Sequence, residues 1–190
     1  MKKLYIIAGC NGAGKTTASM TILPELWRCR EFVNADEIAK GLSPFNPEGM
    51  AIEAGRLMLK RIDALLEGDE SFSIETTLST KSYRQLVSEA HDKGFLVQLL
   101  FFWLPSPEMA IERVSQRVKE GGHNIAEDVI RRRYKAGIEN LIDIYIDIVD
   151  SWMIVENQHN PRIIIADGGK ESDTKIYDQE LYNKLLNYVR

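Results

Sequence analysis

The sequence predicts an α/β fold in which a doubly wound parallel sheet of five strands is covered by helices on both faces. Five short runs are apolar almost without interruption, which is typical of strands buried on both faces. Longer stretches with helical periodicity separate most of these runs, as right-handed crossovers between parallel strands require. A glycine-rich segment directly after the first run is a third indication, because such loops join a strand to a helix in folds of this class.

The ends of the five predicted strands are where a binding site is expected, because ligands of such sheets bind beyond the carboxyl ends of the strands. The strands are LYIIAG, EFVNAD, FSIETT, FLVQLLFFWL and RIIIADG, which begin at residues 4, 31, 72, 95 and 162. The predicted helices cover residues 15–28, 47–67, 81–93, 107–119, 126–156 and 175–190. The residues to examine are therefore the glycine-rich loop, Asp36, residues 75–77 and Asp167.

Length and charge limit the classes of function. A chain of 190 residues fits one domain with a core of its own. Its formal net charge of -4 gives no chain-wide basic field, so a nucleic acid partner is not expected. Cys10 and Cys29 offer no disulfide framework, which favours a reducing, cytoplasmic compartment. The first apolar run is shorter than the roughly 7–15 residues of a signal core, and no segment approaches the ~18 of a membrane span, so no membrane partner is expected.

The segment GCNGAGKT matches the phosphate-binding pattern G-x-x-x-x-G-K-[ST]. Gly12 and Gly14 tolerate positive φ, so successive backbone N–H groups can turn toward phosphate oxygens at the positive end of the next helix. Lys15 is expected to reach the β- and γ-phosphates, and the Thr16 hydroxyl is expected to ligate Mg²⁺. The predicted nucleotide-binding residues are Gly9, Cys10, Asn11, Gly12, Ala13, Gly14, Lys15, Thr16 and Thr17.

This motif predicts a P-loop nucleoside triphosphate hydrolase fold of the small-molecule kinase type, with ATP and Mg²⁺ as cofactors. The alternative is a structural glycine turn that matches the pattern by chance. With glycine at about 7% of residues, a chain of this length carries the pattern by accident on the order of once in a hundred cases. The strand before the motif and the helix after it supply the context that phosphate binding needs.

Asp36 is the candidate catalytic base. It ends the second predicted strand, in NADEIA, and a doubly wound sheet brings that position beside the phosphate loop. A kinase needs a group near the γ-phosphate that orients or deprotonates the acceptor hydroxyl, and an Asp commonly serves. Alternatively, Asp36, preceded by Asn34, caps a helix that starts at Glu37. The two roles are compatible, and we favour catalysis.

Glu75 follows the apolar part of the third predicted strand. A carboxylate buried there is costly unless it is paired, holds a metal through water or binds substrate hydroxyls, so we expect it to contact Mg²⁺ or substrate. The alternative is a carboxylate that accepts from the N–H groups of its own loop. The fourth strand ends in WLPS without an acid, which argues against a motor or switch ATPase. Asp167 is a weaker candidate that can equally stabilise the turn into Gly168.

Arginines are the candidates for stabilising the charge that develops on the transferred phosphoryl group. Arg113 and Arg117 are four residues apart and share a helix face, so we assign them to the catalytic machinery. The three arginines at 131–133 point in different directions around the next helix. For any single arginine, a solvated helix face is the alternative. The segment GGHN at 121–124 predicts a joint that lets a helical region around 113–140 close as a lid.

Several segments together resemble the bacterial zeta-toxin family, P-loop kinases related to UDP-N-acetylglucosamine kinase. The matching segments are GCNGAGKTT, NADEIAKGLSP, AIEAGRLML, SIETTLST and RVSQRVKEGGHNIAEDVIRRRYKAGIENL. The resemblance implies a kinase in which Lys15 and Thr16 hold ATP and Mg²⁺, Asp36 is the base, and Glu75 with Thr77 binds the acceptor. It also implies that one arginine of the pair at 113 and 117 stabilises phosphate.

The sequence departs from the pattern of the toxins at two places. Ser79 stands where an arginine follows their Glu-x-Thr-Leu stretch, and the GGH segment stands where they carry a lid arginine. Both departures weaken the case for a sugar-nucleotide substrate. Within the cluster at 131–133, Arg132 is assigned to substrate binding as a replacement for the lid arginine. The chain resembles the short, free-standing members of the family, which gives little support to toxicity or to an antitoxin partner.

The sequence thus predicts a single kinase domain, residues 1–190, that transfers the γ-phosphoryl group of ATP to a hydroxyl of a small molecule. A sugar nucleotide such as UDP-N-acetylglucosamine is one candidate acceptor. One alternative is a P-loop ATPase that acts as a regulatory module through a protein partner, although the acid pair of such ATPases is missing. Another is a polynucleotide end kinase, which the acidic net charge disfavours but a local strip of arginines would allow.

Overall fold

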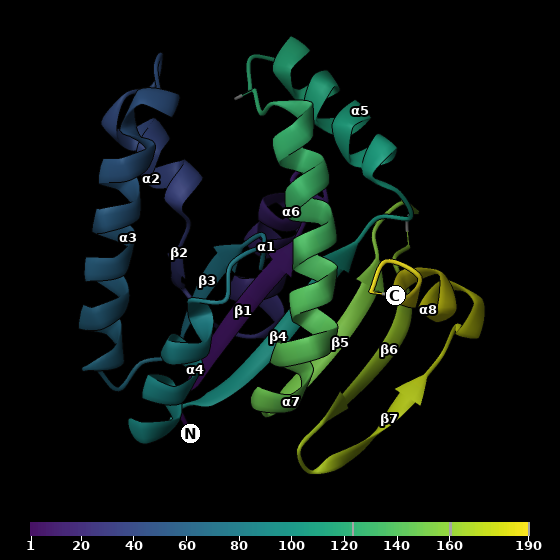
Figure 1. Ribbon diagram of the computed structural model, residues 1–190. Coiled ribbons are helices and arrows are strands. Elements are labelled where there is room, and N and C mark those ends of the chain that lie inside the picture. Colours follow the sequence, from purple (N-terminus) through teal and green to yellow (C-terminus); the bar gives the residue numbers. More distant parts are fainter. Residues whose placement is uncertain (123, 160, 190) are drawn as a thin grey trace.

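The structure is a computed structural model that describes residues 1–122, 124–159 and 161–189 (Figure 1). Its sheet has seven strands in the order β2-β3-β1-β4-β5-β6-β7. Five strands pair in parallel, and they are β1 (Lys3–Gly9), β2 (Glu31–Val33), β3 (Phe72–Thr76), β4 (Leu96–Trp103) and β5 (Ser151–Glu156). Two antiparallel strands extend one edge, β6 (Ile163–Gly169) and β7 (Ser172–Ile176). The predicted α/β fold with a parallel core is confirmed, within a mixed sheet of which four of the five predicted strands are parallel members.

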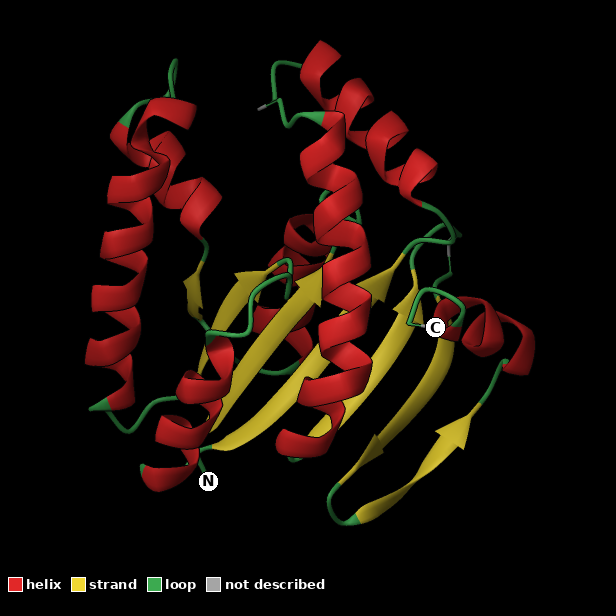
Figure 2. Cartoon of the chain, in the orientation of Figure 1, coloured by secondary structure: helices red, strands yellow, loops and turns green. Residues whose placement is uncertain are grey.

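Helices cover both faces of this sheet. They are α1 (Lys15–Thr21), η1 (Ile22–Leu26), α2 (Ala35–Leu42), η2 (Glu48–Met50), α3 (Ala51–Leu66), α4 (Tyr83–Asp92), α5 (Pro107–Lys119), α6 (Glu127–Asn140), η3 (Leu141–Tyr145), α7 (Ile146–Ile148) and α8 (Gln179–Leu186). Helix α6 crosses one face of the sheet and α1 lies against the other, as Figure 2 shows. None of the described helices is both long enough and apolar enough to cross a membrane.

Strand β1 lies at the centre of the parallel core, where the strand order changes direction. It pairs with β3 on one side and with β4 on the other, and Ala8 is the register partner of both Thr76 and Phe101. The loop after β1 therefore opens into the crevice at the switch point of the sheet, where such folds bind ligands. On either side of this crevice, α2 with α3 and α5 with the adjoining end of α6 rise beyond the ends of the parallel strands (Figure 1).

The fifth parallel strand is not the one that the sequence predicts. A helix was expected over residues 126–156, but the helical segment ends at Ile148 and β5 begins at Ser151. The short run SWMIVE continues the helical spacing of the residues before it, and a short apolar run does not distinguish a strand from a buried helix. The segment that begins at Arg162 does form a strand, β6, but it runs antiparallel to β5.

The end of the chain also differs from the prediction of one helix over 175–190. All five residues of β7 are exposed, so they lack the apolar alternation that marks a half-buried strand. Helix α8 begins only after Asp178, whose side chain accepts a hydrogen bond from Leu181 N at 2.9 Å. An N-cap of this kind sets the start of a helix.

Asp150 explains why the chain turns from helix to strand at this point. Its Oδ2 accepts hydrogen bonds from Val97 N at 2.7 Å and from His91 Nε2 at 2.8 Å, and its Oδ1 lies 3.2 Å from Lys170 Nζ. Burial by itself would raise the pKa of Asp150, but these three donors hold that pKa below its ordinary value. One carboxylate thus joins α4, β4, β5 and the β6–β7 turn.

We expect Asp150→Ala to lower the free energy of unfolding by about 2 kcal/mol, because it leaves the Val97 amide, the His91 ring and the Lys170 ammonium group without their acceptor. This corresponds to a fall in Tm of roughly 4–8 °C in thermal melts near neutral pH. The contribution is present above the unfolded-state pKa of the carboxyl group and is lost as pH falls through the lower folded-state value, so the difference should shrink at acidic pH. Asp147→Ala, an exposed neighbour, is the control, and equal melts of the two variants would contradict the role of Asp150.

Candidate functional site

The phosphate loop has the backbone that its glycines predict. Gly9, Gly12 and Gly14 have φ of 138°, 78° and 77°, a region that residues with a side chain rarely adopt. A Cβ at Gly9 would overlap the Phe102 carbonyl, and a Cβ at Gly12 would lie 2.8 Å from the Ala110 carbonyl oxygen. The loop therefore passes so close to β4 and α5 that glycine is required at both places.

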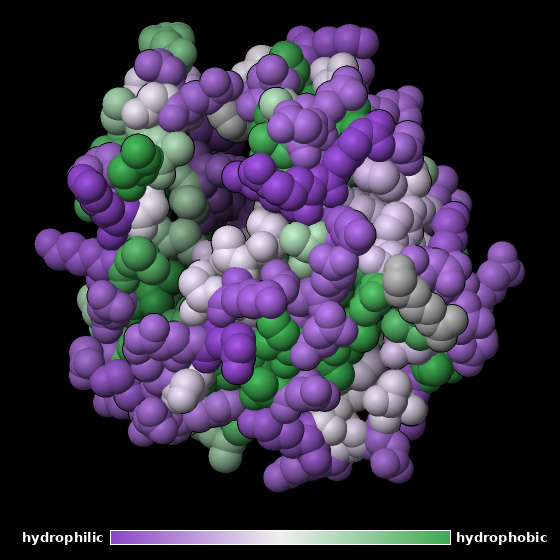
Figure 3. Space-filling view, in the orientation of Figure 1, coloured by the Kyte–Doolittle hydropathy of each residue, from purple (hydrophilic) through white to green (hydrophobic). Residues whose placement is uncertain are grey.

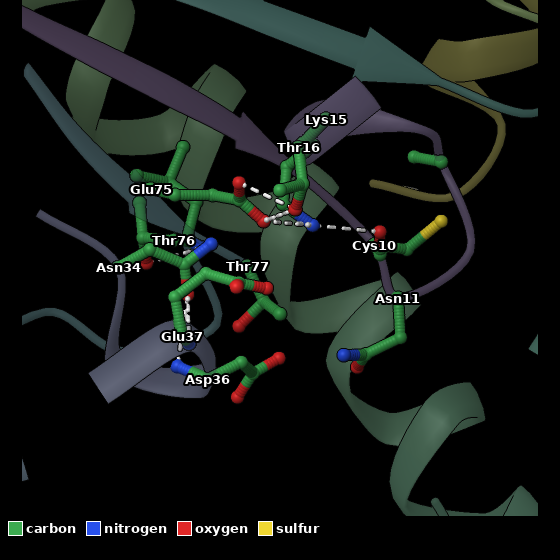
Figure 4. A network of polar contacts seen from close by, with 12 residues as sticks. Cys10, Asn11, Lys15, Thr16, Asn34, Asp36, Glu37, Glu75, Thr76 and Thr77 are labelled. Carbon is green, nitrogen blue, oxygen red and sulfur yellow. Dashed lines mark hydrogen bonds and ion pairs between the residues drawn. The ribbon is translucent and has the colours of Figure 1, made fainter. Parts of the chain in front are cut away.

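Lys15, Thr16 and Glu75 form one polar cluster at the ends of β1 and β3 (Figure 4). The Lys15 side chain is buried, and its Nζ donates to the Cys10 carbonyl oxygen at 3.0 Å and lies 3.7 Å from Glu75 Oε1. The Thr16 hydroxyl donates to the same carboxylate, with Oγ1 2.8 Å from Oε2. The two predicted phosphate-loop ligands and the predicted strand-end carboxylate thus meet at one point.

Burial raises the pKa of Glu75, while the charge of Lys15 and the hydrogen bond from Thr16 act in the opposite direction. The ionised form of Glu75 is therefore less favourable in the folded protein than in water. A group under this kind of strain gains from a cation placed beside it. The side chain of Asn34, buried nearby at the end of β2, also acts to lower the pKa of Glu75.

Asn34, and not Asp36, caps the helix after β2. The Asn34 Oδ1 accepts from Asp36 N at 2.8 Å and from Glu37 N at 3.4 Å, and α2 begins at Ala35. The Asp36 side chain is thereby left in the first turn of α2, exposed and directed with Glu37 into open space (Figure 4). The alternative role of Asp36 as the helix cap is therefore wrong, and its role in catalysis remains a prediction.

These side chains line one cleft with a volume of about 1050 Å³. Figure 3 shows it as a recess with hydrophilic walls, between the α2–α3 side and the α5–α6 side of the molecule. Its described walls carry the phosphate loop together with Asp36, Glu75 and three arginines. Ligand sites commonly fall near this size, so the cleft has room for a nucleotide and a small second substrate.

The three arginines in the cleft are Arg113, Arg117 and Arg133. Arg133 Nη1 donates to Asn11 Oδ1 of the phosphate loop at 3.3 Å, and Arg113 donates to the Gln158 carbonyl oxygen at 3.4 Å. Arg132, assigned to substrate binding from the sequence, is exposed and is not among the residues that line the cleft. Successive residues of a helix point about 100° apart, and α6 turns Arg133 toward the loop.

The remaining sequence candidates lie at the margin of the cleft or away from it. Thr77 Oγ1 is 2.8 Å from Ser79 Oγ, and Thr77 does not line the cleft itself. Asp167 on β6 accepts from the Tyr177 hydroxyl at 2.9 Å and is likewise absent from the lining. Of the predicted joint, Gly121 and Gly122 line the cleft, whereas His123 lies outside the described residues. Movement of the region around 113–140 as a lid remains a prediction.

The sequence analysis missed Asn157, which directly follows β5. Its Nδ2 donates to the Ala13 carbonyl oxygen of the phosphate loop at 2.6 Å, and its Oδ1 accepts from Arg162 Nε at 2.7 Å. A Cβ at Gly14 would lie 2.6 Å from the same amide nitrogen. With β5 assigned to Ser151–Glu156, Asn157 stands at a strand end, the place where ligands of such sheets bind.

In the described part of the chain, no group of three or more His, Cys, Asp or Glu residues is able to hold a metal ion alone. The pair of oxygen donors at Thr16 and Glu75 nevertheless suits a hard cation such as Mg²⁺. Magnesium at nucleotide sites usually takes one or two protein ligands and completes its coordination with phosphate and water. These residues therefore fit a Mg²⁺ ion that arrives with a nucleotide.

Comparison with known proteins gives matches along nearly the whole chain. The family model described as Zeta toxin matches residues 1–181. An uncharacterized protein of Haemophilus influenzae is 32% identical over 140 residues, which cover 70% of this chain and 98% of the relative.

Solved structures of two systems share the fold. The complex AvrRxo1-ORF1:AvrRxo1-ORF2 with sulphate ions gives a TM-score of 0.80 at 18% identity over 97% of this chain, and its form with ATP gives 0.74 at 19%. Our chain spans 63% of that protein chain. A structure of the PezAT toxin–antitoxin system of Streptococcus pneumoniae gives 0.71 at 19% identity, over 98% of this chain and 78% of the other. The TM-scores confirm the predicted α/β fold, and at identities this low the similarity shows the fold alone.

We expect Asn157→Ala to weaken the binding of Mg-ATP by roughly tenfold, because a buried carbonyl of the phosphate loop loses its donor at a cost of about 1–3 kcal/mol. The dissociation constant can be measured by titration calorimetry. Gln158→Ala is the matched control, since that exposed side chain neighbours Asn157 and only its main-chain oxygen contacts Arg113. Unchanged affinity in the Asn157 variant would contradict the proposed support of the loop.

The strained carboxylate of Glu75 predicts a pH dependence in the protein without metal or nucleotide. Because its folded-state pKa is raised, its contribution to stability is present below the ordinary value of 4.5 and is lost as pH rises through the folded-state value. Thermal melts from pH 4.5 toward neutral pH should therefore show Tm of the natural protein falling relative to Glu75→Gln. Glu70→Gln changes an exposed loop position, so its plot of Tm against pH should run parallel to that of the natural protein. A parallel plot for Glu75→Gln would refute the effect.

Proposed function

The chain belongs to the zeta-toxin family, and we propose that it is an ATP-dependent phosphotransferase that moves the γ-phosphoryl group to a hydroxyl of a small molecule. The proposal rests on one observation: two groups of side chains, which we call half-sites, line the same cleft. Lys15, Thr16 and Glu75 form a nucleotide half on the floor of the cleft, and Asp36 faces it from the first turn of α2. Transfer chemistry needs both halves, whereas nucleotide binding alone needs the first.

The nucleotide half holds the donor. The phosphate loop and the positive start of α1 line the same cleft, where their N–H groups would bind phosphate oxygens. When phosphates enter, Lys15 Nζ exchanges the Cys10 carbonyl for the β- and γ-phosphate oxygens. Thr16 and Glu75 would hold Mg²⁺, Thr16 directly and Glu75 directly or through water, and a bound Mg²⁺ supplies neutralisation of phosphate charge.

The acceptor half aligns the hydroxyl. Asp36 lies on α2 with an exposed carboxylate, and the chain turn that begins this helix is held by Asn34. In the proposed step the acceptor oxygen forms a bond to the γ-phosphorus, the bond from that phosphorus to the bridging oxygen of ADP breaks, and the hydroxyl proton passes to Asp36. The gain comes mainly from positioning, because little covalent chemistry is left to the protein.

Arginines from α5 and α6 complete the donor side. Arg113 and Arg117 line the cleft from α5, and Arg133 approaches the loop from α6 through Asn11. A guanidinium fixed beside the transferred group stabilises charge as it develops, and it does so more strongly where water is excluded. We propose Arg133 in place of Arg132 as the contribution of the arginine cluster.

A protein partner is a secondary proposal. Its support is that the similar solved structures are described as a complex of two reading frames and as part of a toxin–antitoxin system. For this chain, the test is growth of cells that express the protein from an inducible promoter. Growth arrest that is abolished by Asp36→Asn would support a toxin that needs a neutralising partner. Unimpaired growth at high expression would contradict this secondary proposal.

The kinase proposal is tested with Mg-ATP and a panel of hydroxyl compounds, with mass spectrometry to detect products heavier by one phosphate. With an identified acceptor, Asp36→Asn should lower kcat by about 10²- to 10⁴-fold, the usual contribution of a general base, while ATP affinity stays nearly unchanged. Asp128→Asn is the matched control, because Asp128 holds the same position in the first turn of α6 and does not line the cleft. Equal kcat in both variants would show that Asp36 is not the base.

A further inference from the structure

Strand β7 is an open edge of the sheet. It stands last in the strand order, pairs only with β6 among the described strands, and is the outermost strand in Figure 1. All five of its residues are exposed. An edge strand of this kind presents unpaired N–H and C=O groups, and it can therefore serve as a template for a strand of another chain.

The main chain near the end of β7 shows which groups face outward. Tyr177 N donates to Ile165 O of β6 at 2.8 Å. The C=O and N–H groups of a trans peptide point in opposite directions, so the Ile176 carbonyl is directed away from β6. Alternation along an antiparallel pair turns the Ile176 N–H and the Thr174 carbonyl the same way. The outer edge of β7 therefore offers main-chain donors and acceptors at the spacing of a β-ladder.

Charged residues and a bulge commonly protect an edge strand from such pairing. A register shift between Asp167 and Gly169 interrupts the contact of β7 with β6, whereas the pairing of Lys175 and Ile176 with β6 is regular. The irregularity lies at the start of β7, so the signs of its charges decide whether the rest of the edge repels or attracts another strand.

The charges on this edge are complementary to those of a second copy of the same edge. Asp173 and Lys175 flank Thr174, and neither forms an ion pair with any residue that the structure describes. When two β7 strands pair antiparallel about a twofold axis at Thr174, Asp173 of each copy lies opposite Lys175 of the other. Residues directly opposite have Cβ atoms about 4.5–5.5 Å apart, and unlike charges and Thr–Thr pairs at this distance stabilise a sheet.

The same charges select one register. A twofold axis at Asp173 would place two carboxylates opposite each other, and an axis at Lys175 would place two ammonium groups opposite each other. Like charges directly opposite destabilise a strand pair. The axis at Thr174 is therefore the favoured one.

Apolar surface beside the edge adds to the contact. Ile176 is 40% exposed and Tyr177 is 57% exposed. Burial of part of this surface favours association. Pairing of two strands of five residues buries less than the roughly 1,600 Å² of a standard interface. We therefore expect a weak contact, with a dissociation constant in the micromolar range.

We propose that β7 pairs with β7 of a second copy of this chain, which joins two sheets into one across a twofold axis at Thr174. Closed twofold dimers are the commonest oligomers of soluble proteins, and in them one surface serves both partners. None of the residues of β7 lines the cleft, so this contact itself covers no cleft residue. The inference is independent of the proposed kinase function.

The test is sedimentation velocity of the full chain from about 1 to 200 µM, where a micromolar dimer changes its population. Asp173→Lys sets like charges opposite each other, so it should raise the dissociation constant at least tenfold. The double variant Asp173→Lys with Lys175→Asp exchanges the charges and should restore the dimer. Glu70→Lys is the matched control, because it makes the same change of charge at an exposed loop position. A monomer throughout this range, or equal dimerisation of Asp173→Lys and the natural protein, would overturn the inference.

A disulfide test examines the register. Cys10 and Cys29 are buried, so a new surface thiol reports on its own position. In the proposed dimer the two Thr174 Cα atoms lie about 5.5 Å apart, within the range that a disulfide spans. Mild oxidation should therefore link Thr174→Cys into a covalent dimer. Ser172→Cys is the control, because its two copies lie roughly 14 Å apart in this register. Equal linkage of the two variants, or no linkage of Thr174→Cys, would refute pairing through β7.

Discussion

The contact between Lys15, Thr16 and Glu75 is the constraint on which the rest of the site depends. It places a buried ammonium group and a strained carboxylate at adjacent strand ends, and burial of either charge alone would be costly. The pairing of β1 with β3 in parallel register is what brings them together, since Ile7 lies opposite Glu75. The cluster therefore couples the order of strands in the sheet to the chemistry of the cleft.

The two sides of the cleft around this cluster are held in place by different contacts. On the side of the phosphate loop, α5 packs so closely on the loop that Gly12 is required, and Asn157 holds the Ala13 carbonyl from the end of β5. On the opposite side, Asn34 fixes the start of α2, whose exposed Asp36 lines the cleft.

Most of the fold was predictable from local pattern, and the errors have physical causes. Four of the five parallel strands, the phosphate loop and the helix over 107–119 were recovered because long apolar runs and glycine spacing are local signals. Strand β5 was missed because its apolar residues continue the helical spacing before it, and only Asp150 with its partners in α4 and β4 ends that helix. The exposed strand β7 carries no apolar pattern to be recognised.

The sequence by itself determined which groups are available: a loop that binds phosphate, acids at strand ends, and arginines in two helical segments. These follow from residue type and spacing within a few turns of chain. Only the tertiary structure decided that Asn34 caps α2 and leaves Asp36 free of that role, that Arg133 and not Arg132 meets the loop, and that Asn157 joins the site. Those choices depend on helix phase and on contacts between segments far apart in the chain, which local sequence patterns do not record.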